Sequence, residues 1–217
     1  MDKIINIPKG NKFYHGGFMH KIIPEGEVGK FKIVYNIATE EDVRFMKVKT
    51  IFNPHRYKEY FDFIPGTYTK LVWDNKEIVM SDTPMEIRTN SEFINNANGS
   101  VLIGGLGLGI ILLSIQNNEK VTSITVVEKN KEVIDLILKH LPLNNKIKIE
   151  VEDIFKWKTK SKFDCIYFDI WNNISGDNYP EMNKLHRKFC KKVNRSNPDY
   201  WIDSWRKKDC KKLNKEY

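Results

Sequence analysis

The sequence predicts an α/β protein with a Rossmann-like, mostly parallel sheet flanked by helices, and three observations support this fold class. From Pro84 onward, short apolar segments alternate with longer amphipathic ones, which is the pattern of strand–helix–strand units. The segments VLI, ITVV and CIYF are almost wholly apolar, as expected of strands buried on both faces. Four glycines in VLIGGLGLGIILLSI, residues 101–115, indicate a tight turn between the first strand and its helix.

Residues 1–83 are expected to form a small β-rich N-terminal segment. FKIVYNI (31–37) is rich in β-forming residues, and VRFMKVKTIF (43–52) partly alternates between apolar and polar residues, so both predict strands. TKLVWDNKEIVM (69–80) predicts a hairpin that turns at Asp74–Asn75.

Residues 84–217 are expected to form the Rossmann-like domain, with a shortened C-terminal part. A first helix is predicted over 84–98, with Pro84 in its first turn and Gly99 past its end. Strands and helices then alternate: strands at 100–104, 123–128, 146–151, 162–171 and 199–205, and helices at 107–118, 129–141, 178–193 and 206–215.

The glycine loop predicts a ligand site. Ligands in such folds bind beyond the carboxyl ends of the strands, and glycine lets the backbone approach a ligand closely. Gly105, Gly107 and Gly109 form a G-x-G-x-G pattern directly after a strand. This spacing departs from the G-x-G-x-x-G of dinucleotide sites and suits a nucleoside without a pyrophosphate. The alternative is a tight turn whose glycines only pack.

Two acidic residues follow at the ends of the next strands. Glu128 ends the second strand, 19 residues after Gly109, where a carboxylate can accept hydrogen bonds from ribose hydroxyls. Asp153 ends the third strand and can accept from an adenine amine, while Ile154 or Phe155 lies against the ring. Alternatively, both carboxylates only stabilise the starts of the segments that follow them.

The glycine loop, Glu128, Asp153 and the strand ending in FDIW resemble class I S-adenosylmethionine-dependent methyltransferases, above all the spermidine-synthase-like branch. The resemblance covers roughly residues 68–171, and small phage-borne proteins of this type are also similar. It implies S-adenosylmethionine as cofactor, with contacts at the three glycines of the loop, Glu128 and Asp153.

One departure concerns the contact to the methionine part of the cofactor. Methyltransferases usually carry an acid two residues before the first glycine, and here that residue is Ile103. The resemblance then leaves Asp169 as the best candidate for the cofactor's amino group and Asp82 as the second.

Asp169 is also the candidate catalytic base. In spermidine synthases a strand-end aspartate deprotonates the amine substrate. Those enzymes carry a second acid two residues on, where this chain has Trp171. We therefore rank methyl transfer to an unidentified acceptor above aminopropyl transfer in polyamine synthesis.

The positive charge is concentrated at the C-terminal end. The net charge is +8, and residues 181–217 hold 12 Lys/Arg against 5 Asp/Glu. This basic tail, with Tyr200, Trp201 and Trp205, would suit single-stranded nucleic acid. The rival interpretation places these aromatic residues in the core, on a fifth strand. Because only 48 residues follow Asp169, a non-catalytic nucleotide- or nucleic-acid-binding module is a further alternative.

Composition argues against several other classes. No segment has the roughly 18 consecutive apolar residues of a membrane helix, and the first residues lack the apolar part of a signal peptide. The three cysteines form no CxxC pair, and the histidines show no metal-binding spacing. We expect a cytoplasmic protein without a metal site. Its oligomeric state stays open, with a homodimer as one option.

Overall fold

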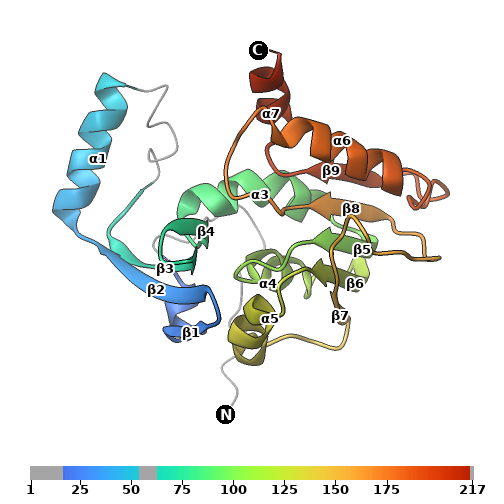
Figure 1. The fold of residues 1–217 in the computed structure, drawn as a ribbon, viewed down its shortest axis with the longest axis horizontal. Coiled ribbons are helices and arrows are strands. Elements are labelled where there is room, and N and C mark those ends of the chain that lie inside the picture. Colours follow the sequence, from blue (N-terminus) through green and yellow to red (C-terminus); the bar gives the residue numbers. More distant parts are fainter. Residues whose placement is uncertain (1–16, 54–62, 216–217) are drawn as a thin grey trace.

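The computed structural model describes residues 17–53 and 63–215. In this part of the chain an antiparallel sheet of four strands precedes a parallel sheet of five (Figure 1). The N-terminal sheet has the order β1-β2-β3-β4. Its strands are β1 (Gly26–Val28), β2 (Phe31–Ala38), β3 (Gly66–Trp73) and β4 (Glu77–Ser81), preceded by the short 3-10 helix η1 (Met19–Lys21).

The predicted strand over residues 43–52 is wrong, because these residues belong to helix α1 (Glu40–Phe52). A capping box explains the helix. The Asp42 backbone NH donates to the Thr39 hydroxyl (3.2 Å), and the Thr39 backbone NH donates to the Asp42 carboxylate (2.8 Å). Three acidic residues in the first turn add favourable charge at the helix N-terminus. This local start signal outweighs the weak alternation of the segment.

The predicted hairpin is confirmed. Strands β3 and β4 pair antiparallel around the turn at Asp74 and Asn75, whose φ angles are 52° and 56°. The Lys76 backbone NH donates to the Trp73 carbonyl oxygen at 3.1 Å, and Asn and Asp tolerate the positive φ at both central residues of this turn. Both strands of this hairpin contribute side chains to the candidate functional site.

The Rossmann-like class is confirmed by a parallel sheet with the order β7-β6-β5-β8-β9. Its strands are β5 (Gly99–Gly104), β6 (Val121–Glu128), β7 (Ile147–Val151), β8 (Cys165–Phe168) and β9 (Trp201–Ser204). The helices are α3 (Pro84–Asn96), α4 (Ile110–Ile115), α5 (Lys131–Ile137) with the 3-10 turn η3 (Leu138–His140), α6 (Asn178–Phe189) and α7 (Lys207–Asn214).

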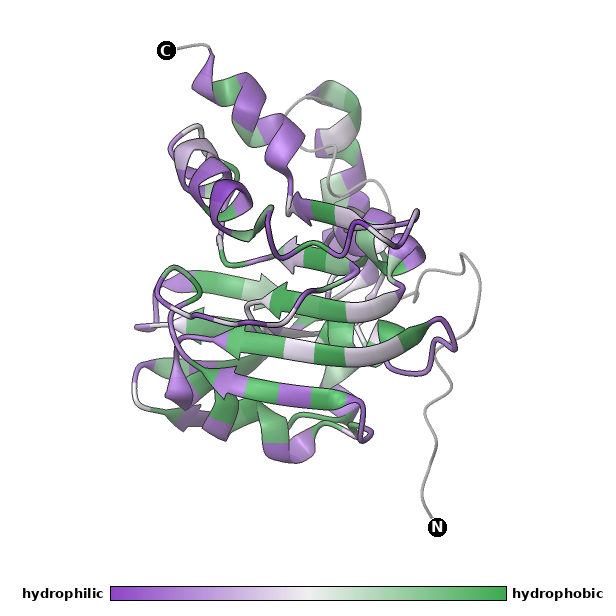
Figure 2. Ribbon diagram, turned by 90° about the vertical axis from the view of Figure 1, so that its right-hand side faces the viewer, coloured by the Kyte–Doolittle hydropathy of each residue, from purple (hydrophilic) through white to green (hydrophobic). Residues whose placement is uncertain are grey.

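Both faces of the parallel sheet are buried, as the apolar strands predict. On β5, Val101 and Ile103 belong to a hydrophobic cluster with residues of α3, α4 and α5. Leu102, between them, belongs to a second cluster that includes Leu185 and Phe189 of α6. The alternation follows the two-residue period of a strand. The largely hydrophobic strands and the more hydrophilic helix before the C-terminus are visible in Figure 2.

The N-terminal sheet shares its core with the parallel sheet. Ile33 of β2, Leu71 of β3 and Met80 of β4 lie in the same cluster as Val101 and Ile103. The domain boundary at 83/84 stays a proposal, and it falls at Thr83, the residue that precedes α3.

The aromatic residues near the C-terminus divide between core and surface. Trp201 lies on β9 and stacks on Phe93 and Tyr167, with ring centroids 5.6 and 5.9 Å apart. Trp205 is only 5% exposed, whereas Tyr200 is 45% exposed. Two of the three rings suggested for base stacking thus pack inside the protein, as the rival interpretation expected.

Candidate functional site

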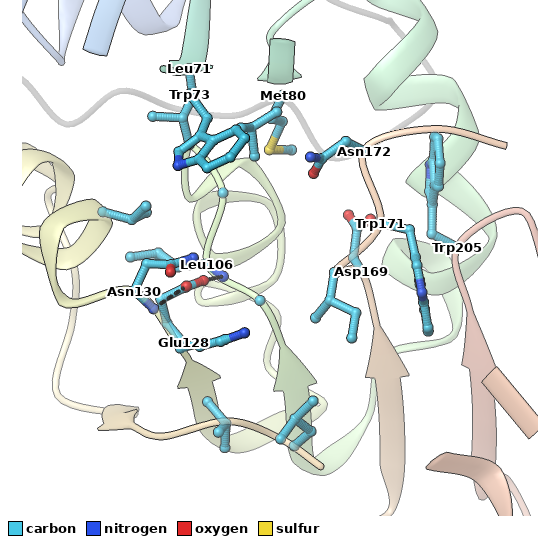
Figure 3. Close-up of a pocket in the computed structure, with 18 of the residues that line it drawn as sticks. Leu71, Trp73, Met80, Leu106, Glu128, Asn130, Asp169, Trp171, Asn172 and Trp205 are labelled. Carbon is cyan, nitrogen blue, oxygen red and sulfur yellow. Dashed lines mark hydrogen bonds between the residues drawn. The ribbon is translucent and has the colours of Figure 1, made fainter. Parts of the chain in front are cut away.

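A cavity of about 660 Å³ lies at the carboxyl ends of β5, β6, β7 and β8 (Figure 3). Chain order in the sheet reverses between β5 and β8, and open α/β sheets bind ligands at such a switch point. The volume is within the range of small-molecule sites. The predicted site residues that line the cavity are Gly105, Gly107, Glu128, Asp153, Ile154 and Asp169.

The loop after β5 needs glycine at two of these positions. Gly105 has a φ of 97°, and a Cβ there would lie 2.2 Å from the carbonyl oxygen of Asp169. Gly107 has a φ of 52°, and its Cβ would lie 2.2 Å from Sδ of Met80. Both contacts are far below van der Waals distance, so the loop can pass between β8 and the N-terminal sheet only without side chains at these positions.

Two predicted site residues do not line the cavity. Gly109 precedes α4 and lies against the side chain of Leu141. Asp82 is buried beside the N-terminal sheet, where its carboxylate accepts from the backbone NH groups of Phe18, Met19 and Thr69 at 2.8, 2.7 and 2.6 Å. We assign Asp82 a structural role, since these bonds tie the chain before η1 to β3.

Glu128 holds the glycine loop. Its Oε2 accepts from the backbone NH of Leu106 at 2.9 Å, and its Oε1 accepts from the backbone NH of Asn130 at 2.8 Å. The residue is 7% exposed, so these charged hydrogen bonds are largely shielded from water. Each carboxylate oxygen has a second lone pair, which leaves acceptor capacity for a hydroxyl in the cavity.

Asp153 and Ile154 form the wall at the end of β7. Oδ1 of Asp153 accepts from the backbone NH of Phe155 at 2.9 Å, and the Ile154 side chain is buried beside it. Lys188 of α6 stabilises this wall by hydrogen bonds to its backbone. Its ammonium group donates to the carbonyl oxygens of Ile154, Phe155 and Trp157 at 2.9, 2.9 and 2.6 Å.

Replacing Lys188 by methionine is expected to loosen this wall. Three carbonyl oxygens would lose a charged donor, which predicts a loss of about 1–3 kcal/mol in the free energy of unfolding, measured by urea denaturation. Lys191→Met, at an exposed position after the same helix, is the matched control. Equal stability of the two variants would show that the ammonium group does not hold the loop.

Asp169 follows β8, lines the cavity and has a strongly shifted pKa. Burial raises the pKa of Asp169 to about 7, and the Asn90 side chain opposes the rise. Asn90 is fixed in turn, because its Oδ1 accepts from the hydroxyl of Tyr167 at 2.8 Å. Burial raises the pKa of Tyr167, so this hydroxyl stays a donor. A carboxylate with a pKa near neutrality suits a general base.

The sequence did not predict the wall contributed by the N-terminal hairpin. Leu71, Trp73 and Met80 approach the cavity from β3 and β4, opposite Asp169, Trp171 and Asn172 (Figure 3). Met80 also contacts the glycine loop, since the backbone NH of Leu108 donates to its Sδ at 3.2 Å. The sequence offered one signal of this wall, because it places the large aromatic residue Trp73 beside the predicted turn. In the structure Trp73 is 39% exposed.

Several solved structures similar to this chain are methyltransferases. The N-methyltransferase NodS from Bradyrhizobium japonicum is 15% identical over 51% of this chain and 63% of its own, with a TM-score of 0.40. DhpI in complex with SAH is 14% identical over 76% of this chain and 67% of its own, with a TM-score of 0.43. The spermidine synthase from Thermotoga maritima is 15% identical over 58% of this chain and 46% of its own, with a TM-score of 0.44.

No protein-family model and no curated protein matches the sequence. The chain spans less than two thirds of NodS and less than half of the spermidine synthase. Within residues 17–53 and 63–215, no helix has the length and apolar character needed to cross a bilayer, and no three His, Cys, Asp or Glu side chains are placed to hold a metal ion. We base the functional proposal on the chain's own residues.

Proposed function

We propose that the protein is an S-adenosylmethionine-dependent methyltransferase. The observation that carries this proposal is the meeting of four features in one cavity: a loop with crowded glycines at 105 and 107, Glu128, Asp153, and Asp169. They lie at the ends of four neighbouring strands. Along the sheet edge Asp153 comes first, followed by Glu128, the glycine loop and Asp169, which is the order that adenine, ribose and the methionine part would follow.

Each residue then has a role that its surroundings support. Glu128 has acceptor capacity for the ribose hydroxyls, and Asp153 for the exocyclic amine of adenine. Ile154 offers an apolar surface to the adenine ring. Asp169, at the far side of the glycine loop, would lie near the methionine part and the acceptor. When bound, S-adenosylmethionine supplies a methyl group on a positively charged sulfur. Asp169 can take the proton that a nucleophile must lose.

Aminopropyl transfer is the second candidate function. The segment after β8 carries Asp169, which this reaction would also use. Trp171 occupies the place where a polyamine site needs another carboxylate. The indole NH of Trp171 donates to Glu181 at 2.9 Å, which fixes an indole ring in the place of that carboxylate. This observation favours methyl transfer.

Calorimetric titration with S-adenosylhomocysteine tests the cofactor assignment. We expect binding with one site per chain, and at least tenfold weaker binding to Gly105→Ala, because the added methyl group would collide with the Asp169 carbonyl. No heat of binding at millimolar ligand would contradict the proposal. A preference for the decarboxylated cofactor would instead support aminopropyl transfer.

A further inference from the structure

The cavity is strongly acidic although the protein is basic. The carboxylate side chains that line it are Glu77, Glu86, Glu128, Asp153, Asp169 and Glu181. Among the residues that the structure describes, Lys129 is the one cationic residue that lines the cavity. The whole chain carries a net charge of +8. A focused negative potential of this kind attracts cations and repels phosphates and carboxylates.

Four of these acids, Glu77, Glu86, Asp169 and Glu181, lie on the side away from the proposed adenosine contacts. Glu86 is in the first turn of α3, and its backbone carbonyl accepts from Asn90, the residue that also stabilises the Asp169 carboxylate. Glu77 and Glu181 are joined to the segment after β8, the former through Asn172 and the latter through Trp171. The negative charge is therefore concentrated where an acceptor would bind.

A tryptophan side chain, that of Trp171, forms the other part of this half of the cavity, and Trp73 lies across the cavity from it (Figure 3). Trp171 is held beside Asp169 by its bond to Glu181, whereas Trp73 enters the cavity from the N-terminal hairpin on the opposite side (Figure 3). A hydrogen bond of 3.0 Å from Asn172 to Glu77 connects the two sides. Indole rings bind planar groups by stacking, and their faces attract cations.

We infer that the methyl acceptor is an amine with a planar, apolar body, whose cationic head binds beside Asp169 and whose body packs against Trp171. This inference rests on the proposed function and narrows its substrate class. A polyamine fits less well, because it has no planar part that could stack on the indole ring of Trp171.

The transfer step follows from this placement. The bound ammonium group gives one proton to the Asp169 carboxylate, which frees the nitrogen lone pair. That pair forms the new bond to the methyl carbon while the bond from this carbon to sulfur breaks, and the sulfur keeps the bonding electrons. The products are an N-methylammonium ion and S-adenosylhomocysteine. Asp169 then releases its proton to water.

Three ligands separate the effect of the ligand's charge from the effect of its planar ring. The protein is first saturated with S-adenosylhomocysteine and then titrated with tryptamine, indole-3-propionate or spermidine. We expect tryptamine to bind at least tenfold more tightly than indole-3-propionate, which has the same ring and a negative charge, and than spermidine, which lacks a ring. Equal or tighter binding of either other probe, or no binding of tryptamine, overturns the inference.

The first titration keeps this outcome distinct from failure of the proposed function. If S-adenosylhomocysteine binds and tryptamine does not, the substrate class is wrong and the cofactor assignment stands. If S-adenosylhomocysteine does not bind, both fall.

Variants at the tryptophan wall give a second test. We expect Trp171→Leu to weaken tryptamine binding about tenfold and to leave S-adenosylhomocysteine binding within about threefold. Glu181→Gln keeps an acceptor for the indole NH while removing a charge, so it serves if Trp171→Leu does not fold. Tyr200→Leu, at an exposed aromatic residue outside the cavity, is the control. Unchanged tryptamine affinity in both cavity variants contradicts the inference.

Discussion

Replacing Glu128 by alanine is expected to weaken S-adenosylhomocysteine binding by about 1–3 kcal/mol, which is roughly 5- to 150-fold. The substitution removes the acceptor proposed for the ribose hydroxyls. It also leaves the backbone NH groups of Leu106 and Asn130 without their carboxylate, so the free energy of unfolding should fall by about 2 kcal/mol or more. Calorimetry and urea denaturation measure the two effects separately.

A ligand comparison separates the ribose contact from the loop contact of Glu128. The intact protein should bind adenosine at least tenfold more tightly than 2′,3′-dideoxyadenosine, because only adenosine offers hydroxyls to the carboxylate. For the Glu128→Ala variant, Glu150→Ala is the matched control, since Glu150 lies on the neighbouring strand β7 and is paired with Lys148 outside the cavity. Equal affinities for the two nucleosides would place the ribose elsewhere.

The fold could be predicted from the sequence wherever a local pattern determines the structure. Buried parallel strands are almost purely apolar, and Asp74–Asn75 suits the positive φ angles of a hairpin turn. Residues 43–52 were mispredicted because the deciding signal precedes them. The capping box at Thr39 and Asp42 starts a helix that then continues through the partly alternating segment.

The meeting of the strand-end acids at the candidate site was predictable for a related reason. Carboxyl ends of parallel strands meet at one sheet edge, so residues that end such strands come together whatever else the fold does. Glu128, Asp153 and Asp169 all follow this rule. Asp82 does not, because it follows a strand of the antiparallel sheet, and its carboxylate accepts from backbone NH groups of η1 and β3 instead of entering the cavity.

The wall of the cavity contributed by the hairpin could not be predicted, because it depends on how two sheets dock. The bond between Glu77 and Asn172 joins residues 95 positions apart in the chain. Nothing in the hairpin sequence states which of its faces will lie over the glycine loop. Likewise, the pairing of Trp171 with Glu181 depends on the position of α6, which is set by the packing of Leu185 and Phe189 under the sheet.

Replacing Asp169 by asparagine is expected to affect stability and catalysis in opposite directions. The pKa of Asp169 is about 7 in the folded protein and near its ordinary value of 3.8 in the unfolded chain. Between these two pH values the folded state holds a proton that the unfolded chain has released. The contribution of this group to stability is therefore fully present below about pH 4 and is lost as the pH rises through 7.

Asp169→Asn removes that pH-dependent loss. At pH 8 the variant should be more stable than the original protein by about 2–4 kcal/mol, and at pH 4 the difference should vanish. Urea denaturation at both pH values measures it, with Asp177→Asn, at an exposed position before α6, as the control. A stability difference that is the same at both pH values would mean that Asp169 titrates near its ordinary pKa.

The same substitution should lower the rate of methyl transfer from S-adenosylmethionine to tryptamine by about 10²- to 10⁴-fold, because an amide cannot accept the proton of the ammonium group. In the original protein the rate should fall as the pH drops below about 7, where Asp169 becomes protonated. If the variant keeps both its rate and this pH dependence, another group acts as the base.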